Sequence, residues 1–312
     1  MKSSVGRTGK DLISLHGASR EELREIIERA REHAAGEAPG ALEGRTVCLA
    51  FFEPSTRTAS SFELAARRAG ANVVSISGEG SSLSKGESLI DTVVTLDSLG
   101  ADAIVLRHPA AGAASLAARH TDAAVVNAGD GQGQHPTQAL LDLYALAEAE
   151  GGFDELEGRR AVVIGDLLHS RVARSVIPAF KAAGMEVAVA GPRTLLPRDA
   201  SDIWGCPVFD SLNGALDWGA DTLYTLRLQR ERMASAEVPS VAEYAASFGV
   251  TSEHLAHGMR LLHPGPVNRG VEVAGDVVLG EHSLIRDQVA AGIHVRSAVL
   301  ELFSGARRGA AA

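Results

Sequence analysis

Short apolar runs alternate with segments of helical periodicity along most of the chain, and this alternation limits the fold more than any other feature. The runs at 46–52, 103–106 and 161–164 are almost wholly apolar. Such runs are typical of strands buried on both faces of a parallel sheet. Between them, apolar residues recur every three or four positions, as on one face of a helix. We therefore predict an α/β fold with mainly parallel sheets.

The chain length predicts two such α/β units. At 312 residues the chain can form two domains, each with its own core. A long predicted helix stops at Gly151-Gly152, and the alternation of strands and helices then restarts. We predict two doubly wound domains, residues 1–150 and 151–283, and a closing helix at 284–304 that packs back on the first domain.

One turn between a strand and a helix carries an unusual set of polar residues. The strand at 46–52 is followed by Pro54-Ser55-Thr56-Arg57-Thr58 and then by a predicted helix from Ser61 to Gly70. The start of a helix offers free backbone N–H groups to an anion, and hydroxyls and a guanidinium add directed donors. Ser55 and Thr56 could instead be simple helix caps. Caps do not account for the guanidinium and the last hydroxyl, so the pattern favours a phosphate site.

Further polar residues stand where predicted strands end. Arg57, Arg107 and Arg227 each lie at or just beyond the carboxyl end of a strand, and His135 follows another strand through a Gly-rich loop. Taken singly, each arginine would be read as a solvated surface charge. In open α/β sheets, however, ligands bind at this edge. Three arginines there indicate a site for an anionic substrate.

Other motifs do not match known sites. Gly129–Gly133 lacks the Gly-Lys-Ser/Thr of a P-loop, and Gly165–Arg171 lacks the glycine spacing of a dinucleotide fingerprint. His254 and His257 would share one face of a helix there, but no third metal ligand accompanies them, so surface histidines are the favoured interpretation. No Ser/His/Asp or Cys/His signature indicates a covalent nucleophile.

Composition narrows the class of protein. The net charge of −9 argues against a nucleic-acid partner. No run approaches the roughly 20 apolar residues that span a bilayer, and the first residues do not read as a secretory signal. Cys48 and Cys206 have no metal or redox spacing and are predicted to be buried thiols in a reducing cytoplasm.

Five motifs stand in a characteristic order. They are Phe52-Glu53-Pro54-Ser55-Thr56-Arg57-Thr58, Ser84-Lys85-Gly86-Glu87-Ser88, His135-Pro136-Thr137-Gln138, Arg227-Leu228-Gln229, and His263-Pro264-Gly265-Pro266 followed by Arg269-Gly270 and Glu272. Over about residues 11–303 the chain resembles the aspartate carbamoyltransferase family. The Ser-Thr-Arg-Thr and His-Pro-x-Gln motifs are common to transcarbamoylases, whereas the Lys-Gly-Glu loop and His-Pro-Gly-Pro point to the aspartate enzymes.

The resemblance implies transfer of a carbamoyl group from carbamoyl phosphate to the α-amine of L-aspartate, an early step of de novo pyrimidine synthesis, without a metal or redox cofactor. The residues implied to bind carbamoyl phosphate are Ser55, Thr56, Arg57, Thr58, Ser81, Arg107, His135, Gln138, Gly265 and Pro266. Those implied to bind aspartate are Lys85, Arg171, Arg227 and Gln229. The implied catalytic residues are Arg57, Thr58, Lys85, Arg107 and His135. Either Lys85 or the departing phosphate would take the amine proton.

The resemblance also implies a homotrimer with shared active sites. The loop at 81–87 would reach the neighbouring subunit, where Ser81 or Ser82 would contact phosphate. Trimers of this family stand alone, pair through regulatory chains or join dihydroorotase, the enzyme of the next step, and the sequence leaves these assemblies open. Many relatives carry a basic residue where this chain has Ala59, which predicts a changed local ion pair with activity retained.

Three alternative functions fit the residues less well. An ornithine carbamoyltransferase would carry His-Cys-Leu-Pro at 263–266 and would not need two arginines in its amino-acid half. A non-catalytic phosphate-binding homologue is disfavoured because every expected substrate residue is present. A nicotinamide oxidoreductase rests on analogy of fold alone.

Overall fold

The computed structural model describes residues 7–77, 87–228 and 240–304, and the chain divides into two compact units. Unit 1 comprises residues 1–141 and 291–312, and unit 2 comprises residues 142–290. Both boundaries fall inside helices, α5 (Pro136–Glu150) and α10 (Ile285–Ser304). The other elements described in unit 1 are β1 (Arg7–Thr8), β2 (Asp11–Leu12), α1 (Arg20–Ala35), β3 (Thr46–Phe51), α2 (Thr56–Arg68), β4 (Asn72–Ser77), α3 (Leu89–Ser98), β5 (Ala103–His108), α4 (Ala113–Ala118) and β6 (Ala124–Asp130).

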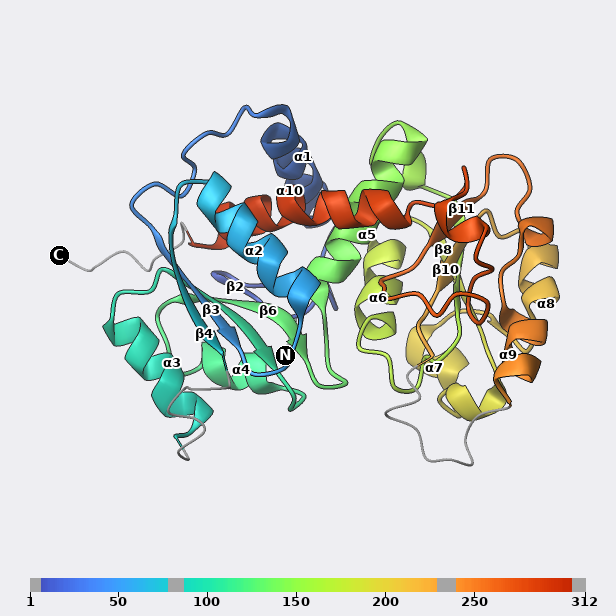
Figure 1. Ribbon diagram of the computed structural model, residues 1–312, viewed down its shortest axis with the longest axis horizontal. Helices are drawn as coiled ribbons and strands as arrows, with labels where there is room; N and C mark the ends of the chain where they lie inside the picture. The colour runs from blue at the N-terminus through green and yellow to red at the C-terminus, as the bar shows by residue number, and fades with distance from the viewer. Residues whose placement is uncertain (1–6, 78–86, 229–239, 305–312) are drawn as a thin grey trace. The chain divides into compact units, whose positions relative to one another are not determined.

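Unit 1 is built around a mainly parallel sheet. The described strands follow the order β1-β2-β6-β5-β3-β4, and β1 with β2 forms the antiparallel pair at one edge. The pairs β2–β6, β6–β5, β5–β3 and β3–β4 are parallel. Helices α1, α2 and α10 cover one face, and α3 and α4 cover the other (Figure 1). The predicted α/β architecture is confirmed for this unit.

The apolar runs form the buried centre of the sheet, as predicted. Val47, Cys48, Leu49 and Ala50 in β3 are each at most 3% exposed. Burial raises the pKa of the Cys48 thiol to about 11. Cys206 is also buried, and both cysteines are free thiols. These observations agree with structural roles for the two side chains.

Helix α2 begins earlier than predicted. The periodic residues Phe62, Ala65 and Ala66 mark its buried stripe, but the helix already starts at Thr56. Its first turn carries no apolar signal because Thr56 and Arg57 are exposed. The hydroxyl-rich turn is therefore the amino end of the helix itself, where backbone N–H groups lack intrahelical partners.

Helix α10 packs on the elements of unit 1 through its last turns. The Arg296 guanidinium lies 5.0 Å from the centre of the Phe62 ring in α2, and the Ser297 hydroxyl donates to the Ala65 carbonyl at 3.3 Å. Glu301 lies 2.8 Å from Nε2 of His33 in α1. These contacts hold the second half of α10 against α1 and α2.

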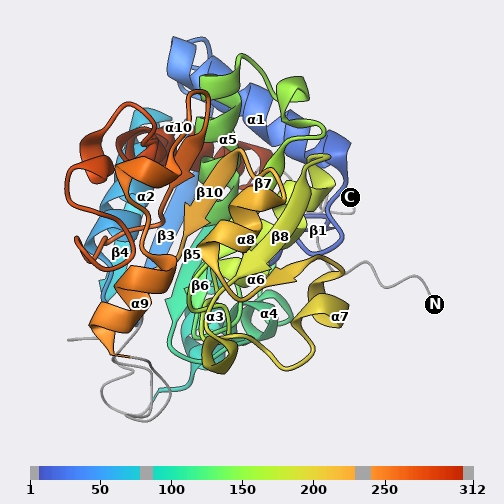
Figure 2. The same cartoon turned by 90° about the vertical axis from the view of Figure 1, so that its right-hand side faces the viewer.

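Unit 2 has a second parallel sheet, with the described strands in the order β11-β10-β7-β8-β9. Helix α6 lies on one face, and α8 and α9 lie on the other (Figures 1 and 2). The helices and strands are β7 (Arg160–Ile164), α6 (Ala173–Ala182), β8 (Glu186–Ala190), α7 (Ala200–Trp204), β9 (Val208–Phe209), α8 (Leu212–Asp217), β10 (Thr222–Thr225), α9 (Val241–Phe248) and β11 (Arg260–Leu262). The prediction of a second doubly wound unit is confirmed.

Several short elements were not predicted from the sequence, because their apolar patterns are only a few residues long: β1, β2, α7, β9, α8 and α9. The capping box formed by Ser240 and Glu243 is a sequence signal that could have located α9. The expectation that His254 and His257 share a helix face is wrong. A 3₁₀ turn ends at His254, whose Nδ1 accepts from the Thr251 N–H at 3.1 Å.

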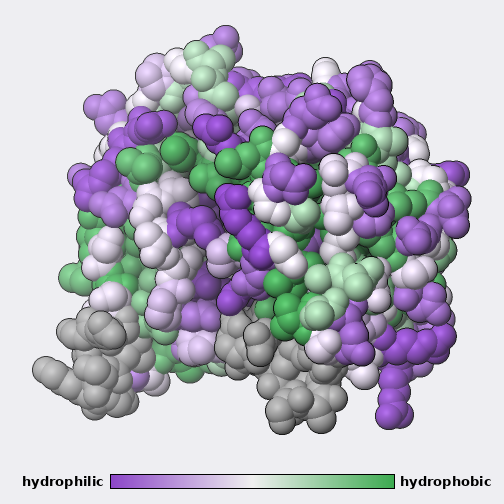
Figure 3. All heavy atoms as spheres, turned by 45° about the vertical axis from the view of Figure 1, so that its right-hand side comes forward, coloured by the Kyte–Doolittle hydropathy of each residue, from purple (hydrophilic) through white to green (hydrophobic). Residues whose placement is uncertain are grey.

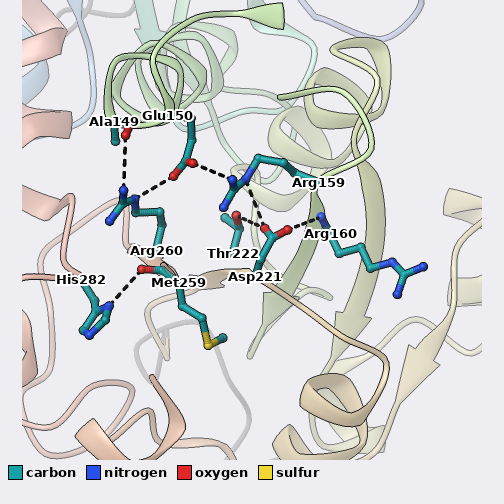
Figure 4. A network of polar contacts seen from close by, with 9 residues as sticks. All are labelled: Ala149, Glu150, Arg159, Arg160, Asp221, Thr222, Met259, Arg260 and His282. Carbon is teal, nitrogen blue, oxygen red and sulfur yellow. Dashed lines mark hydrogen bonds and ion pairs between the residues drawn. The ribbon is translucent and has the colours of Figure 1, made fainter. Parts of the chain in front are cut away.

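A polar network ties together the amino ends of the strands in unit 2 (Figure 4). Glu150, at the end of α5, accepts from Arg159 at 2.6 Å and from Arg260 at 2.7 Å. Asp221 accepts from the Arg160 backbone N–H at 3.1 Å and from the Thr222 hydroxyl at 2.7 Å. The network lies at the amino ends of the strands, whereas the candidate site residues stand at their carboxyl ends.

The surface mixes polar and apolar side chains. Hydrophilic and hydrophobic residues are interspersed on the face shown in Figure 3. In the described part of the chain, no helix has both the length and the apolar character needed to cross a membrane.

Candidate active site

The turn after β3 presents hydroxyl and guanidinium groups at the amino end of α2. Ser55 is the N-cap residue with an extended backbone, yet its side chain makes no capping hydrogen bond. Thr56 and Arg57 are exposed and Thr58 is 7% exposed. The alternative that Ser55 only caps the helix therefore has no hydrogen bond to support it. The turn remains a site where backbone N–H groups and side-chain donors can meet an anion.

Arg107 lies beside this turn because of strand register. Phe51 of β3 pairs with Arg107 of β5, and the Phe52 N–H donates to the Arg107 carbonyl at 2.9 Å. The strand ends at His108, so Arg107 lies at its carboxyl end, as the sequence predicted. The side chain is mostly buried. Its Nη1 donates to the Ala128 carbonyl at 3.2 Å, and its Nη2 lies 3.2 Å from Oε2 of Glu53.

These two contacts orient the Arg107 guanidinium. A carbonyl of β6 and a carboxylate from the turn after β3 hold it from two sides. A planar guanidinium fixed in this way loses little side-chain freedom when it binds a further oxyanion. In the sequence, Glu53 stands out only as part of a motif, because its pairing with Arg107 depends on the tertiary fold.

His135 and Gln138 lie at the start of α5. His135 is 5% exposed and Gln138 is 9% exposed, and the Gln138 N–H donates to the His135 carbonyl at 3.1 Å. Since β6 is the neighbour of β5, the loop that leads to His135 starts next to the end of β5, where His108 pairs with Asp130. The sheet thus brings the described site residues of unit 1 together at the carboxyl ends of its strands.

Asp130 organises the loop before His135, a role that the sequence analysis missed. Its carboxylate accepts from the Gly112 N–H at 2.7 Å, the Gln134 N–H at 2.7 Å and Asn127 Nδ2 at 3.0 Å. Gly133 packs against it, since a Cβ there would lie 2.6 Å from Oδ1 of Asp130. An acidic residue between two glycines in a loop was the only available signal, and it does not by itself identify a partner.

Arg171 stands in the loop between β7 and α6, and its side chain is 7% exposed. The loop is braced by Asp166, which is fully buried and accepts from Nδ1 of His169 at 2.9 Å and from the His169 N–H at 3.1 Å. The Ser170 hydroxyl accepts from the Ala173 N–H at 3.1 Å and so holds the start of α6. These bonds place Arg171 on a fixed loop.

Arg227 and the Gly265-Pro266 pair follow neighbouring strands. β10 lies between β7 and β11, so the loops after these three strands emerge side by side at one edge of the unit 2 sheet. The Gly265 N–H donates to Nδ1 of His263 at 2.8 Å. Arg227 is partly exposed. Predicted residues Ser81, Lys85 and Gln229 lie outside the described residues.

Family models match both parts of the chain. Residues 10–148 match the model described as aspartate/ornithine carbamoyltransferase, carbamoyl-P binding domain. Residues 157–303 match the aspartate/ornithine carbamoyltransferase, Asp/Orn binding domain. The chain belongs to this family.

Individual members of the carbamoyltransferase family agree with this membership along nearly the whole chain. The aspartate carbamoyltransferase catalytic subunit of Rubrobacter xylanophilus is 68% identical over 303 residues, which cover 97% of this chain and 99% of the relative. The corresponding subunit of Gemmatimonas aurantiaca is 47% identical, with 97% and 96% covered.

Solved structures of the family have the same fold. The catalytic subunit of M. jannaschii aspartate transcarbamoylase superposes with a TM-score of 0.83 at 34% identity, covering 96% of this chain and 99% of that one. Aspartate transcarbamoylase from Trypanosoma cruzi in complex with N-(phosphonacetyl)-L-aspartic acid gives a TM-score of 0.82 at 32% identity, with 94% and 95% covered.

Proposed function

We propose that this chain transfers the carbamoyl group of carbamoyl phosphate to the α-amine of L-aspartate, giving N-carbamoyl-L-aspartate and phosphate, an early step of pyrimidine synthesis. Relatives named aspartate carbamoyltransferase catalytic subunit, 68% and 47% identical, support this reaction. So do the Trypanosoma cruzi structures described with carbamoyl phosphate and aspartate or with carbamoyl aspartate and phosphate. Residues 1–150 would serve carbamoyl phosphate and residues 151–283 would serve aspartate.

The phosphate group is assigned to the turn at the start of α2 and to Arg107. Ser55, Thr56, Arg57 and Thr58 offer hydroxyl, guanidinium and backbone donors at the positive end of a helix. Arg107, held by Glu53 and Ala128 as described above, adds a fixed cation. This adjacency, set by the pairing of Phe51 with Arg107, is the observation that carries the proposal.

The carbamoyl carbonyl is assigned to donors from three elements. Thr58, Arg107 and His135 would polarise its oxygen, and the resulting positive field stabilises the negative charge that develops as the amine attacks. Gln138, Gly265 and Pro266 would accept from the carbamoyl NH₂ group. Ser81 or Ser82 would add a contact to the phosphate.

Aspartate is assigned to cations of the second half. Arg171 and Arg227 would bind its two carboxylates together with Lys85, and Gln229 would support them. Two arginines suit a dicarboxylate, because a guanidinium binds each carboxylate through paired N–H donors. Ornithine, with one carboxylate and a cationic side chain, lacks the second anionic group. This difference favours aspartate over the other substrate that the family description includes.

The chemical step requires a neutral amine. The α-amine of a free amino acid is protonated near neutral pH, so it must lose a proton before it attacks the carbamoyl carbon. The C–N bond then forms, a tetrahedral intermediate carries the charge on oxygen, and the C–O bond to phosphate breaks. Lys85 or the departing phosphate would take the proton. Fixed donors and substrate positioning lower the barrier.

We further propose a homotrimer in which residues 81–87 complete a neighbour's site. β4 is the edge strand of the unit 1 sheet, and each of its side chains is at least partly exposed. Large exposed apolar side chains lie on β4 and the two helices next to it in sequence: Leu64, Val74, Val94 and Leu99, at 44–76% exposure. Among the described strands β4 pairs on one side only, and such a strand edge with apolar neighbours is a surface suited to self-association. The predicted crossing loop follows β4 directly in the sequence. A regulatory chain or dihydroorotase partner, and a cytoplasmic location, remain predictions.

The test is a product assay with each amino acid. The purified chain, supplied with carbamoyl phosphate, should form N-carbamoyl-L-aspartate from aspartate and no citrulline from ornithine. Citrulline as the main product would overturn the aspartate assignment. Neither product, from a folded chain that binds carbamoyl phosphate, would favour the non-catalytic alternative.

A further inference from the structure

The fully buried carboxylate of Glu272 joins two of the three loops that carry the proposed substrate residues of unit 2. Its Oε1 accepts from the Leu228 N–H at 2.8 Å, in the residue that follows Arg227. The same oxygen accepts from Asn268 Nδ2 at 2.7 Å, and Oε2 accepts from the Asn268 N–H at 2.8 Å, two residues after Pro266. One side chain thus holds the backbone beyond β10 and the backbone beyond β11.

Glu272 is itself firmly placed. Its carbonyl accepts from the Val250 N–H at 2.9 Å, and the Ala274 N–H donates to the Val250 carbonyl at 2.8 Å. The Gly249 backbone is packed closely nearby, since a Cβ there would lie 2.9 Å from the Val271 carbonyl oxygen. The segment that carries Glu272 is therefore anchored to the chain after α9, so its side chain can act as a fixed support.

Because Glu272 is buried, its carboxylate would be energetically unfavourable without the N–H groups that donate to it. Burial raises the pKa of Glu272, while the N–H donors of Leu228 and Asn268 oppose that rise. A buried carboxylate is stable only where its oxygens accept several hydrogen bonds, and removing an acceptor leaves buried N–H groups without a partner. The loops and the carboxylate therefore stabilise one another in a single arrangement.

His263 extends the same support to the Gly265-Pro266 pair. Its Nδ1 accepts from the Gly265 N–H at 2.8 Å, which requires the proton of a neutral ring to be on Nε2. That nitrogen lies 3.9 Å from Oε2 of Glu272. The His263 N–H in turn donates to Oε1 of Gln288 at 3.0 Å, and Gln288 donates to the buried Asp142 at 2.7 Å. The loop after β11 is thereby held by Gln288 at its start and by Glu272 at Asn268.

We propose that Glu272 is a positioning residue that sets the geometry of Arg227 for the incoming amino-acid substrate. The inference rests on the proposed assignment of Arg227 to aspartate. Leu228 is almost fully buried and is fixed through its N–H to Glu272, so the Glu272 carboxylate defines where the preceding residue leaves β10. Small displacements of a group that binds substrate are costly in rate, because the reacting atoms must be held in line.

The test compares Glu272→Gln with Glu150→Gln. A glutamine at 272 places an NH₂ group where only acceptors fit, so at least one N–H of Leu228 or Asn268 loses its partner. Glu150 is a matched control: it is a glutamate of unit 2, its side chain is 11% exposed, and it accepts from two arginines at the opposite sheet edge. Both substitutions should lower the melting temperature of the folded chain.

The two variants should differ in kinetics. We expect Glu272→Gln to raise the KM for aspartate about tenfold or more, the loss that one unsatisfied buried group typically produces. Its Kd for carbamoyl phosphate should rise less than the KM for aspartate, because the phosphate is assigned to unit 1 and only Gly265 and Pro266 of the supported loops are assigned to carbamoyl phosphate. Glu150→Gln should keep both constants near those of the parent. An unchanged aspartate KM in folded Glu272→Gln, or an equal rise in Glu150→Gln, would overturn the inference.

A second variant keeps the test decisive if Glu272→Gln does not fold. Asn268→Ala removes a side-chain donor and leaves both backbone donors, so the KM for aspartate should rise about two- to fivefold, as expected for one net hydrogen bond. No rise would refute the positioning role. Arg227→Ala distinguishes a failure of the site assignment from a failure of the positioning role. An unchanged KM for aspartate in Arg227→Ala would refute the assignment of Arg227 to aspartate. A large rise of this KM in Arg227→Ala, with no rise in Asn268→Ala, would refute only the role of Glu272.

Discussion

Replacing Arg107 by alanine is the most direct test of the carbamoyl phosphate assignment. The guanidinium is mostly buried and held by Glu53 and Ala128, so it is preorganised to meet negative charge in the transition state. Loss of one such donor costs about 3–4 kcal/mol of transition-state stabilisation, or about 100- to 1,000-fold in kcat. The KM for carbamoyl phosphate should rise as well, because Arg107 also contacts the ground-state phosphate.

The same substitution also affects stability, and the structure bounds the effect. The Ala128 carbonyl loses its donor and is buried, which costs about 1–3 kcal/mol. The Glu53 carboxylate is 22% exposed and can be solvated, so its lost ion pair adds only about 0–1 kcal/mol. The sum is smaller than the roughly 5–15 kcal/mol stability of a typical domain. The variant should therefore fold with a lowered melting temperature.

Arg45→Ala is the matched control. Arg45 lies just before β3 at the other end of the sheet, where its Nη1 pairs with Oδ1 of Asp102 at 3.0 Å. Arg45 is partly exposed, but Asp102 is buried and retains the hydrogen bond from the Thr46 N–H while losing that from Arg45, so the removal of Arg45 should cost about 1–3 kcal/mol of stability and leave turnover unchanged. Steady-state kinetics and thermal melts of both variants check the reasoning. Turnover of Arg107→Ala within about fivefold of the parent, or equal inactivity of Arg45→Ala, would refute it.

Three further outcomes are expected. Arg227→Ala should raise the aspartate requirement while calorimetric titration shows carbamoyl phosphate binding largely intact; a comparable loss of that affinity would place Arg227 in the wrong half of the site. The inactive Lys85→Ala and His135→Ala chains should regain activity when they are dissociated, mixed and reassembled, because some sites then combine native residues from two subunits. A shared site would be excluded if native mass spectrometry confirms hybrid trimers and these stay inactive. Gly131→Ala should lower the free energy of unfolding by about 1–3 kcal/mol, because the φ of +48° is unfavourable for alanine and the new Cβ would lie 2.5 Å from the Pro109 carbonyl oxygen. Chemical denaturation measures this loss, and an unchanged denaturation midpoint would show that the loop before His135 can adjust.

The sequence by itself determined the architecture of this protein. Apolar runs of strand length between amphipathic segments leave few arrangements other than parallel sheets covered by helices. The burial of the apolar runs that form β3 and β5 follows from the same patterns. Motif spacing also identified the family, because Ser-Thr-Arg-Thr, His-Pro-Thr-Gln and His-Pro-Gly-Pro occur together in order.

Periodicity failed where no apolar stripe is present. The first turn of α2 exposes Thr56 and Arg57, so its pattern looks like a loop although backbone hydrogen bonds make it helical. The two-residue strands β1 and β2 and the short helices α7 and α8 carry too few residues for a pattern to emerge. In both cases long-range packing, which a local window does not contain, decides the conformation.

Only the tertiary structure decided which side chains support the substrate residues. Glu53 meets Arg107, Asp130 fixes the loop before His135, and Glu272 holds the backbone beside Arg227. Each of these contacts is made by a carboxylate whose partners are set by strand register and loop path, and a buried acid looks the same in the sequence as a solvated one. Burial turns the carboxylates of Asp130 and Glu272 from ordinary surface charges into groups that must be satisfied by nearby donors, and that requirement gives their loops a single arrangement.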